Sequence, residues 1–295
     1  MELDKKEASA LSRLFSASVI RDFGRRGRSP LFTRLIEQTQ IAAQIPSDST
    51  VGTAFEKAFS ILKTSGVRDD YVYRSAITQK VLLGRHSLST ATLLNEVRAG
   101  SCKADVVVLN GTSTAYEIKS ERDSLARLKN QIENYRRIFA SVNVVVSSSH
   151  LHEVLEATPE DVGVITLSGR FRFQTEREAQ NKPERTSALM ILEILRVEEA
   201  VSILRNLRQD VPSVPNTQMR FELNRIFSEL DPMIVHDEMV KELRSSRSQA
   251  SLADFIGSVP VSLRAASLAA KPNLRSRVRI KEAVDTPLVE ALAWK

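Results

Sequence analysis

The chain has 295 residues, of which 42% are hydrophobic and 5% aromatic, and it carries a formal net charge of +6. This length allows a substantial hydrophobic core and more than one module, and the positive charge suits a polyanionic partner without proving one. A single cysteine, Cys102, excludes internal disulfide bonds and fits a reducing compartment. No apolar run is long enough to cross a membrane, so we expect a cytoplasmic protein without a membrane anchor.

Residues 1–68 are predicted to form a helical N-terminal region. Apolar residues recur there at helical spacing, and Ser29-Pro30 is typical of a helix start. The sequence GRRGR at 24–28 predicts a flexible basic break. Its arginines are either solvated or in contact with phosphate groups, and exposed clusters of this kind are more often solvated.

Residues 69–176 form the predicted core, which begins with a helix and leads into strands. Ser87 or Ser89 is positioned to cap a second helix that runs to Leu94. Glu96 then lies at the end of that helix or at the start of the first strand. A β-branched run at 103–109 and an alternating run at 114–119 predict two more strands, joined by a hairpin turn at Asn110-Gly111.

The placement of the charged residues in these two strands depends on the hairpin register. Glu117 and Lys119 lie two residues apart and leave the same face of their strand. A two-residue turn would put Asp105 on the other face, because a slip of one residue reverses every side chain. A three-residue loop of Leu109–Gly111, with its glycine in the left-handed conformation, puts Asp105 opposite Ala115 and diagonal to Glu117. We expect this bulged form.

A helix and two further strands complete the predicted core. The segment Leu125–Phe139 has an apolar side at helical spacing, and Gln131 lies beside that side. The runs VNVVV and VGVITLS predict strands that are buried on both faces. This order predicts an α/β core with a mixed sheet, an antiparallel hairpin and crossover helices.

The combined pattern resembles a known superfamily. Asp105, then Glu117-Ile118-Lys119, and then a helix with Gln131 resemble the catalytic core of the PD-(D/E)XK nucleases, and the likeness runs from about residue 71 to residue 174. Residue 104 is Ala rather than Pro, a variation that such families often show. The wider strings, such as KADVVVLNGT and YEIKSERDSLARL, look like a bacterial branch of that superfamily. The resemblance implies a restriction-endonuclease-like mixed β-sheet core flanked by helices.

The same resemblance implies a metal-dependent nuclease. Asp105 and Glu117 would bind Mg²⁺, for which Mn²⁺ can substitute, and Glu96 would either join this metal site or be a surface glutamate. Lys119 would orient the attacking water and stabilise developing negative charge, and Gln131 would support the site. The alternative for Glu117 and Lys119 is an ordinary surface ion pair. The expected partner is nucleic acid, DNA in particular, and a homodimer is a further expectation, since many members of the superfamily act as dimers.

Residues 177–295 are predicted to form a helical C-terminal module. Past Gln174 the polar sequence TEREAQNKPERTS predicts a linker or a surface helix, and residues 188–207 predict one long amphipathic helix. The basic stretch NLRSRVRIKEA is either a solvated face or a phosphate contact. His150 and His152 lack a third ligand, so we expect a helix start there rather than a zinc site.

Two functions fit the sequence. The first is a DNA endonuclease that hydrolyses phosphodiester bonds. The second is a catalytically silent module of a defence or mobile-element system, which binds nucleic acid or docks a protein. The presence of Asp105, Glu117 and Lys119 together favours the enzyme, because an acidic pair near phosphate would weaken simple binding unless a metal ion intervened.

Overall fold

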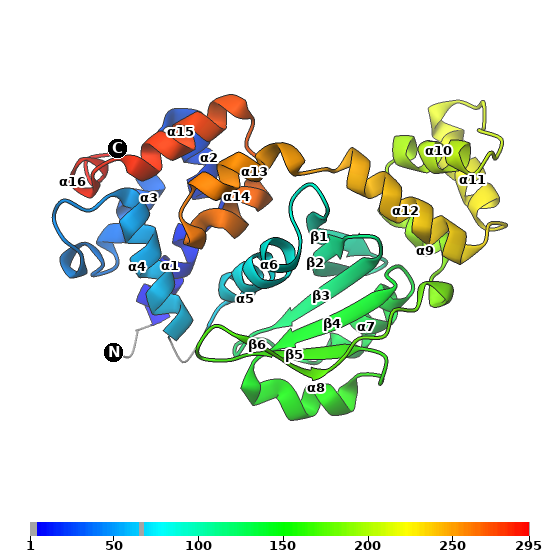
Figure 1. Ribbon diagram of the computed structural model, residues 1–295, viewed down its shortest axis with the longest axis horizontal. Helices are drawn as coiled ribbons and strands as arrows, with labels where there is room; N and C mark the ends of the chain where they lie inside the picture. Colours follow the sequence, from blue (N-terminus) through cyan, green and yellow to red (C-terminus); the bar gives the residue numbers. More distant parts are fainter. Residues whose placement is uncertain (1–4, 65–67, 295) are drawn as a thin grey trace.

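A single mixed β-sheet lies at the centre of the protein (Figure 1). The computed structural model describes residues 5–64 and 68–294, and in these residues six strands pair in the order β1-β2-β3-β4-β5-β6. The first three strands are antiparallel, β3 to β5 are parallel, and β6 is antiparallel to β5. The strands are β1 (Thr92–Ala99), β2 (Cys102–Leu109), β3 (Ser113–Lys119), β4 (Ser141–Val146), β5 (Gly163–Leu167) and β6 (Phe173–Arg177). The expected α/β class, with a mixed sheet flanked by helices, is confirmed.

The central strands are buried because helices cover both faces of the sheet. All residues of β4 are buried, as its run of valines predicts. Helices α7 (Leu128–Arg136) and α8 (Leu151–Ala157) form the crossovers that the parallel strands require. β6 was not expected: the polar segment after Gln174 begins as an edge strand, where polar residues face solvent, and the prediction of a linker or helix is wrong there.

The helices divide between the two faces of the sheet and so form two cores. The first core joins one sheet face, with Leu93 and Tyr116, to the N-terminal helices and to the last helices of the chain. The second core joins the other face, with Leu94 and Ala115, to α7, α8 and the helices that follow β6. The N-terminal helices are α1 (Lys5–Leu14), α2 (Ala17–Arg26), α3 (Pro30–Glu37), α4 (Val51–Thr64), α5 (Asp70–Ile77) and α6 (Leu83–Arg85).

The helices of the C-terminal region pack into both cores. The first four lie against the second core, and the last four return to the N-terminal helices (Figure 1). There Trp294 packs against Phe23, with ring centroids 5.8 Å apart, and Thr50 forms a bridge with Pro287. None of the helices in the described ranges could span a membrane. These helices are α9 (Ala188–Ile194), α10 (Val197–Asn206), α11 (Asn216–Phe227), α12 (Pro232–Ser246), α13 (Ala253–Ser258), α14 (Arg264–Ala270), α15 (Leu274–Asp285) and α16 (Leu288–Ala291).

The basic segment at 24–28 is mostly helical rather than a flexible break. Helix α2 continues to Arg26, and only Gly27, with φ of 69°, ends it. Gly24 lies inside the helix where α15 crosses, and a Cβ at this position would be 3.0 Å from the Cβ of Ser276. The glycine therefore permits close helix packing, a role that the spacing of glycines in the sequence did not reveal.

Pairing and capping interactions overrule two further helix predictions. The helix expected to run into β1 does not form, because Thr92 already pairs with Leu109 in the sheet. The single helix expected over 188–207 is two helices, α9 and α10, with the break before α10. At that break the backbone N–H of Arg196 donates to the carboxylate of Glu199 at 2.8 Å, so a capping interaction starts a new helix within a continuous amphipathic pattern.

A buried histidine connects α12 to the sheet. Ser113 Oγ accepts the Ala140 N–H at 3.0 Å, and its own hydroxyl lies 2.8 Å from Nε2 of His236. The other ring nitrogen, Nδ1, lies 3.1 Å from Oδ1 of Asp237. Burial lowers the pKa of His236, with Asp237 opposing the shift, so the fold favours the neutral ring.

We predict that His236→Gln reduces the loss of stability in acid. The pKa of His236 is lower in the folded protein than the unfolded value of 6.5. The favourable contribution of His236 to the free energy of unfolding is therefore complete above pH 6.5 and is lost as pH falls below that value. Urea unfolding at pH 5 and at pH 7.5 measures the free energy of unfolding of both proteins. Between pH 7.5 and pH 5 the free energy of unfolding should fall more for the wild type than for the variant. An equal fall in both proteins would contradict the prediction.

Candidate active site

The hairpin between β2 and β3 has a register two residues from the one expected. Leu109 pairs with Ser113, and the loop is Asn110–Thr112, closed by a hydrogen bond of 3.1 Å from its first N–H to its last carbonyl. The expected pairing of Asp105 with Ala115 is therefore wrong. A shift of two residues nevertheless keeps each side chain on its face, whereas a shift of one would have reversed it.

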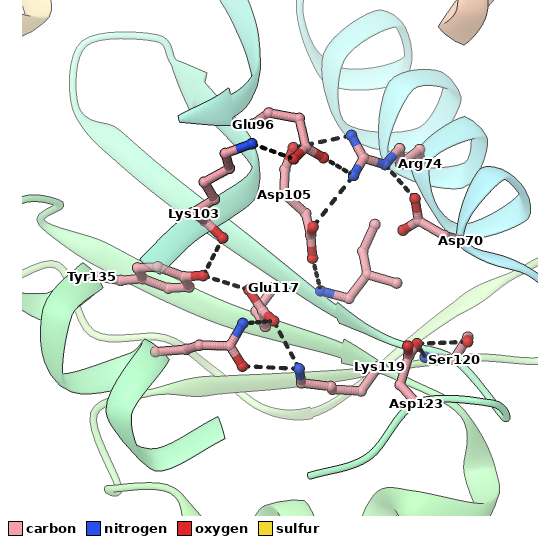
Figure 2. Close-up of polar contacts among 12 residues, drawn as sticks. Asp70, Arg74, Glu96, Lys103, Asp105, Glu117, Lys119, Ser120, Asp123 and Tyr135 are labelled. Carbon is pink, nitrogen blue, oxygen red and sulfur yellow. Dashed lines mark hydrogen bonds and ion pairs between the residues drawn. The ribbon is translucent and has the colours of Figure 1, made fainter. Parts of the chain in front are cut away.

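Asp105 accepts a backbone hydrogen bond just beyond the point where the regular pairing of β2 with β3 ends, at Val106 and Tyr116. The N–H of Ile118 donates to Asp105 Oδ2 at 2.8 Å. In a continuing antiparallel ladder a backbone carbonyl of β2 would accept such a bond. The other oxygen, Oδ1, lies 3.3 Å from Nη2 of Arg74 in α5 (Figure 2). Both oxygens of the carboxylate are thus held.

The charge of Asp105 is disfavoured in this position. Its pKa is raised to about 7, first by burial and then by the negative charge of Glu117, while the Ile118 N–H and Arg74 act in the opposite direction. Two carboxylates that repel each other in this way favour a bound proton or cation between them. The site therefore attracts positive charge.

Glu117 and Lys119 are buried, with relative exposures of 2% and 5%, so they are not an ordinary surface ion pair. Lys119 Nζ lies 2.9 Å from Glu117 Oε1 and donates to Gln131 Oε1 at 2.9 Å. Gln131 Nε2 in turn donates to Glu117 Oε1 at 2.5 Å. The resulting ring joins the end of β3 to α7, and Figure 2 labels its members Glu117 and Lys119. The structure thus brings three of the predicted site residues into direct contact.

Tyr135 holds the second oxygen of Glu117. Its hydroxyl lies 2.7 Å from Glu117 Oε2 and 2.5 Å from the carbonyl of Lys103. Burial and the charge of Glu117 raise the pKa of Tyr135, so the phenol stays neutral and can donate. Sequence reasoning placed this residue in the apolar stripe of the helix and missed its hydroxyl. The available signal was its position four residues after Gln131, on the same helix side.

Glu96 lies near Asp105 but is linked to it by an arginine. It lies in β1 with φ of 53°, pairs with Arg74, and has Oε2 3.8 Å from Nζ of Lys103. Arg74 also pairs with Asp70, with Nε 2.6 Å from Oδ2, so one guanidinium joins three carboxylates (Figure 2). Sequence reasoning missed Arg74 and Asp70. Their i, i+4 spacing predicts a local ion pair but not the contact with β1 and β2.

An open cavity of about 710 Å³ lies against this group of residues. Asp105, Glu117 and Lys119 line it, together with cations from two other elements. Arg98 comes from β1 and Arg127 directly precedes α7, and both side chains are exposed. The cavity thus combines buried carboxylates with exposed positive charge, which suits an anionic substrate that a metal ion would bridge to the carboxylates.

The donor set fits Mg²⁺ better than a transition metal. Within the two described ranges, no group of three or more His, Cys, Asp or Glu side chains is arranged to hold a metal ion. Mg²⁺ commonly uses one or two carboxylates and completes its octahedron with water and phosphate oxygens. Asp105 and Glu117 meet that requirement, because both line the cavity and their repulsion contributes to the raised pKa of Asp105.

Comparison with known proteins relates the chain to a bacteriophage protein. The family described as Bacteriophage P4 protein cII matches residues 64–267, more than half of the chain. Protein cII of Enterobacteria phage P4 is 40% identical over 80 residues, which are 26% of this chain and 30% of that protein. The chain thus covers less than a third of that relative's length in this match. No solved structure matches the chain.

We predict that Asp105→Asn stabilises the metal-free protein, and more so as pH rises. The pKa of Asp105 is about 7 in the folded protein, against a reference value of 3.8. Its favourable contribution to the free energy of unfolding is therefore complete below pH 3.8 and is lost as pH rises through 7. Above pH 7 the free energy of unfolding of the variant should exceed that of wild type by on the order of 2 kcal/mol.

Thermal unfolding in EDTA from pH 5 to pH 8 measures this difference. Asp210→Asn is the matched control, because Asp210 is exposed and makes the same change of charge. The difference in unfolding midpoint between Asp105→Asn and wild type should grow with pH, while the difference between Asp210→Asn and wild type should not change with pH. A constant or shrinking difference for Asp105→Asn would show that the carboxylate is not under this repulsion.

Proposed function

The chain belongs to the bacteriophage P4 protein cII family, and we propose that it is a metal-dependent nuclease that hydrolyses phosphodiester bonds. DNA is the proposed substrate. The observation that carries the proposal is the contact set of Glu117, Lys119 and Gln131 beside Asp105 in one open cavity. Two carboxylates and an ammonium group around a solvent-filled space match the requirements of phosphodiester hydrolysis.

Each side chain has a separate role in this proposal. Asp105 and Glu117 would hold Mg²⁺ or Mn²⁺, which when bound neutralises phosphate charge and activates water. Lys119 Nζ lies between Glu117 Oε1 and Gln131 Oε1, so the ammonium group donates hydrogen bonds to oxygen atoms at this place in the cavity. We assign it the orientation of the attacking water and stabilisation of the negative charge that develops on phosphorus oxygens.

Gln131 and Tyr135 orient Glu117 from α7. The amide of Gln131 donates to one carboxylate oxygen and the hydroxyl of Tyr135 lies at hydrogen-bond distance from the other. A carboxylate held on both oxygens cannot rotate freely, so its free lone pairs have a fixed direction. Such positioning keeps a metal ligand in place between turnovers.

Glu96 has an indirect role in this proposal. Its carboxylate is engaged by Arg74, which also reaches Asp105. We assign Glu96 to positioning: it holds the guanidinium that in turn holds Asp105 Oδ1. The metal role that the superfamily resemblance implies for Glu96 would require Arg74 to release it.

A binding module without catalysis is the second candidate. It is favoured by the exposed Arg98 and Arg127 at the cavity, which attract phosphate whether or not a bond is cut. The buried ring around Glu117 favours the enzyme, because simple phosphate binding gains nothing from a carboxylate there. The match to protein cII of phage P4 covers only part of that protein, so it leaves the activity of this chain as a proposal.

We predict that the purified protein cuts nucleic acid only with a divalent metal. Linear duplex, supercoiled and single-stranded DNA and RNA are incubated with Mg²⁺, Mn²⁺ or EDTA. Asp105→Asn, Glu117→Gln and Lys119→Met should each reduce the rate by about 100-fold or more, since each removes a group that acts on the transition state. Asp210→Asn is the control and should cut as wild type. Equal inactivity of wild type and all variants, with unchanged binding, would favour the second candidate.

We also predict that Mn²⁺ stabilises the wild type through the two carboxylates. A ligand at 100 times its dissociation constant adds about 2.7 kcal/mol to the free energy of unfolding. The midpoint of thermal unfolding at pH 8 should therefore rise with Mn²⁺ for wild type and for Asp210→Asn. Asp105→Asn and Glu117→Gln should lose most of the rise, and a full rise in both would place the metal elsewhere.

A further inference from the structure

A second cavity lies next to the catalytic one. It has a volume of about 370 Å³ and is lined by β1, the break before α10, the end of α12 and the end of α14. Arg98 lines both cavities, so they are neighbours across β1. The roles proposed above for Asp105, Glu117, Lys119 and Gln131 do not involve this second cavity.

Cations outnumber carboxylates in the lining of the second cavity. Arg196, Arg247 and Lys271 approach it from three different helices or helix ends. Arg247 is neutralised by Glu199, with Nη2 2.6 Å from Oε2. For Arg196 and Lys271 no ion pair exists with any residue of the described ranges. Burial lowers the pKa of Lys271, and the charges of Arg247 and Arg196 lower it further, so these cations repel one another across the space.

The acidic residues of the lining do not balance this charge. Glu96 is already engaged by Arg74, outside the cavity. Glu193 is exposed on α9 and lines the cavity together with Arg98, Arg196 and Lys271. The first turn of α10, directly after Arg196, carries Glu198 and Glu199, but neither of them lines the cavity.

The backbone holds two of the lining residues in an unfavourable conformation. Glu96 and Lys271 have φ of 53° and 46°, and they are two of the four non-glycine residues with positive φ in the described part of the chain. Lys271 ends α14 in the left-handed conformation, where glycine is the usual residue. Such a conformation costs about 1 kcal/mol, and it is retained where the side chain is needed.

We propose that the second cavity binds a phosphate group of a nucleic-acid strand whose cleaved bond lies in the first cavity. This inference rests on the proposed nuclease function and names how its substrate is held. Arg98 would lie between the two phosphates, and Arg196 and Lys271 would contact the distal one. Free phosphate and a nucleotide share this chemistry, so the test includes inorganic phosphate as a separate arm.

Two substitutions remove the charge while protecting the fold. Arg196→Ser puts a preferred N-cap residue at the start of α10, and Lys271→Gly relieves the left-handed strain. Arg247 is left intact, because its loss would leave the buried Glu199 unpaired.

The matched control is Arg170→Ser with Arg208→Gly. Both residues are exposed, neither lines either cavity, and Arg208 also has positive φ, at 55°. The control pair therefore loses the same net charge and relieves the same kind of backbone strain as the test pair. A difference between the two pairs reports on the position of the charges.

Fluorescence anisotropy of a labelled DNA strand, measured in EDTA at several salt concentrations, separates binding from cutting. At 0.15 M salt each neutralised phosphate is worth about fivefold in affinity by counterion release, so the Arg196→Ser/Lys271→Gly protein, which loses its hold on one phosphate, should bind about fivefold more weakly. The slope of log affinity against log salt should fall by about one unit. The control pair should bind nearly as wild type.

The outcomes distinguish this inference from the proposed function. Weakened binding in the test pair alone supports phosphate binding at the second cavity, and cleavage by wild type decides the nuclease proposal separately. Cleavage by wild type together with unchanged binding by the test pair overturns the inference and leaves the nuclease proposal standing. Absence of binding by wild type overturns it too. Thermal stabilisation by inorganic phosphate that the test pair loses, without any loss of DNA binding, would identify a free-anion site instead.

Discussion

The hydrogen bond from the Ile118 N–H to Asp105 Oδ2 is the interaction on which the site depends. Regular pairing of β2 with β3 ends at Val106 and Tyr116. Beyond that point a carboxylate accepts the hydrogen bond that a backbone carbonyl would accept in a continuing ladder. The bond satisfies a backbone donor in a buried region and at the same time fixes the direction of the acid. Because Glu117 precedes Ile118, the same stretch of β3 carries Glu117 and holds Asp105 of β2, and both carboxylates line one cavity.

The burial of charge around Glu117 is better explained by function than by stability. A buried ion pair seldom repays the cost of removing both ions from water, and apolar residues of similar size often serve as well. Here Glu117 and Lys119 are nearly inaccessible and need Gln131 and Tyr135 to complete their hydrogen bonds. An arrangement with this many dependent polar contacts rigidifies the position of a few atoms. Rigid placement of charge is what transition-state stabilisation requires.

The sequence predicted the fold class and the grouping of Asp105 with Glu117, because strand patterns and side-chain alternation are local properties. It placed the hairpin loop one residue too early and so set the strand register two residues off, since loop closure at Asn110–Thr112 depends on pairing along both strands. Contacts between distant elements were out of reach. Arg74 reaches Asp105 from a separate helix, and nothing within α5 indicates that it does. The break at Arg196 was hidden for a related reason, since its apolar pattern continues through the capping interaction.

The second cavity joins parts of the protein that belong to different cores. Lys271 follows α14 of the first core, whereas Arg196 precedes α10 of the second. The chain passes between these cores after α12, where the buried Gln249 accepts the N–H of Leu93 in β1. This bond anchors the passage to the strand that also carries Arg98 toward both cavities. A phosphate held there would therefore contact both cores through one strand, and its binding would oppose any movement of one core relative to the other.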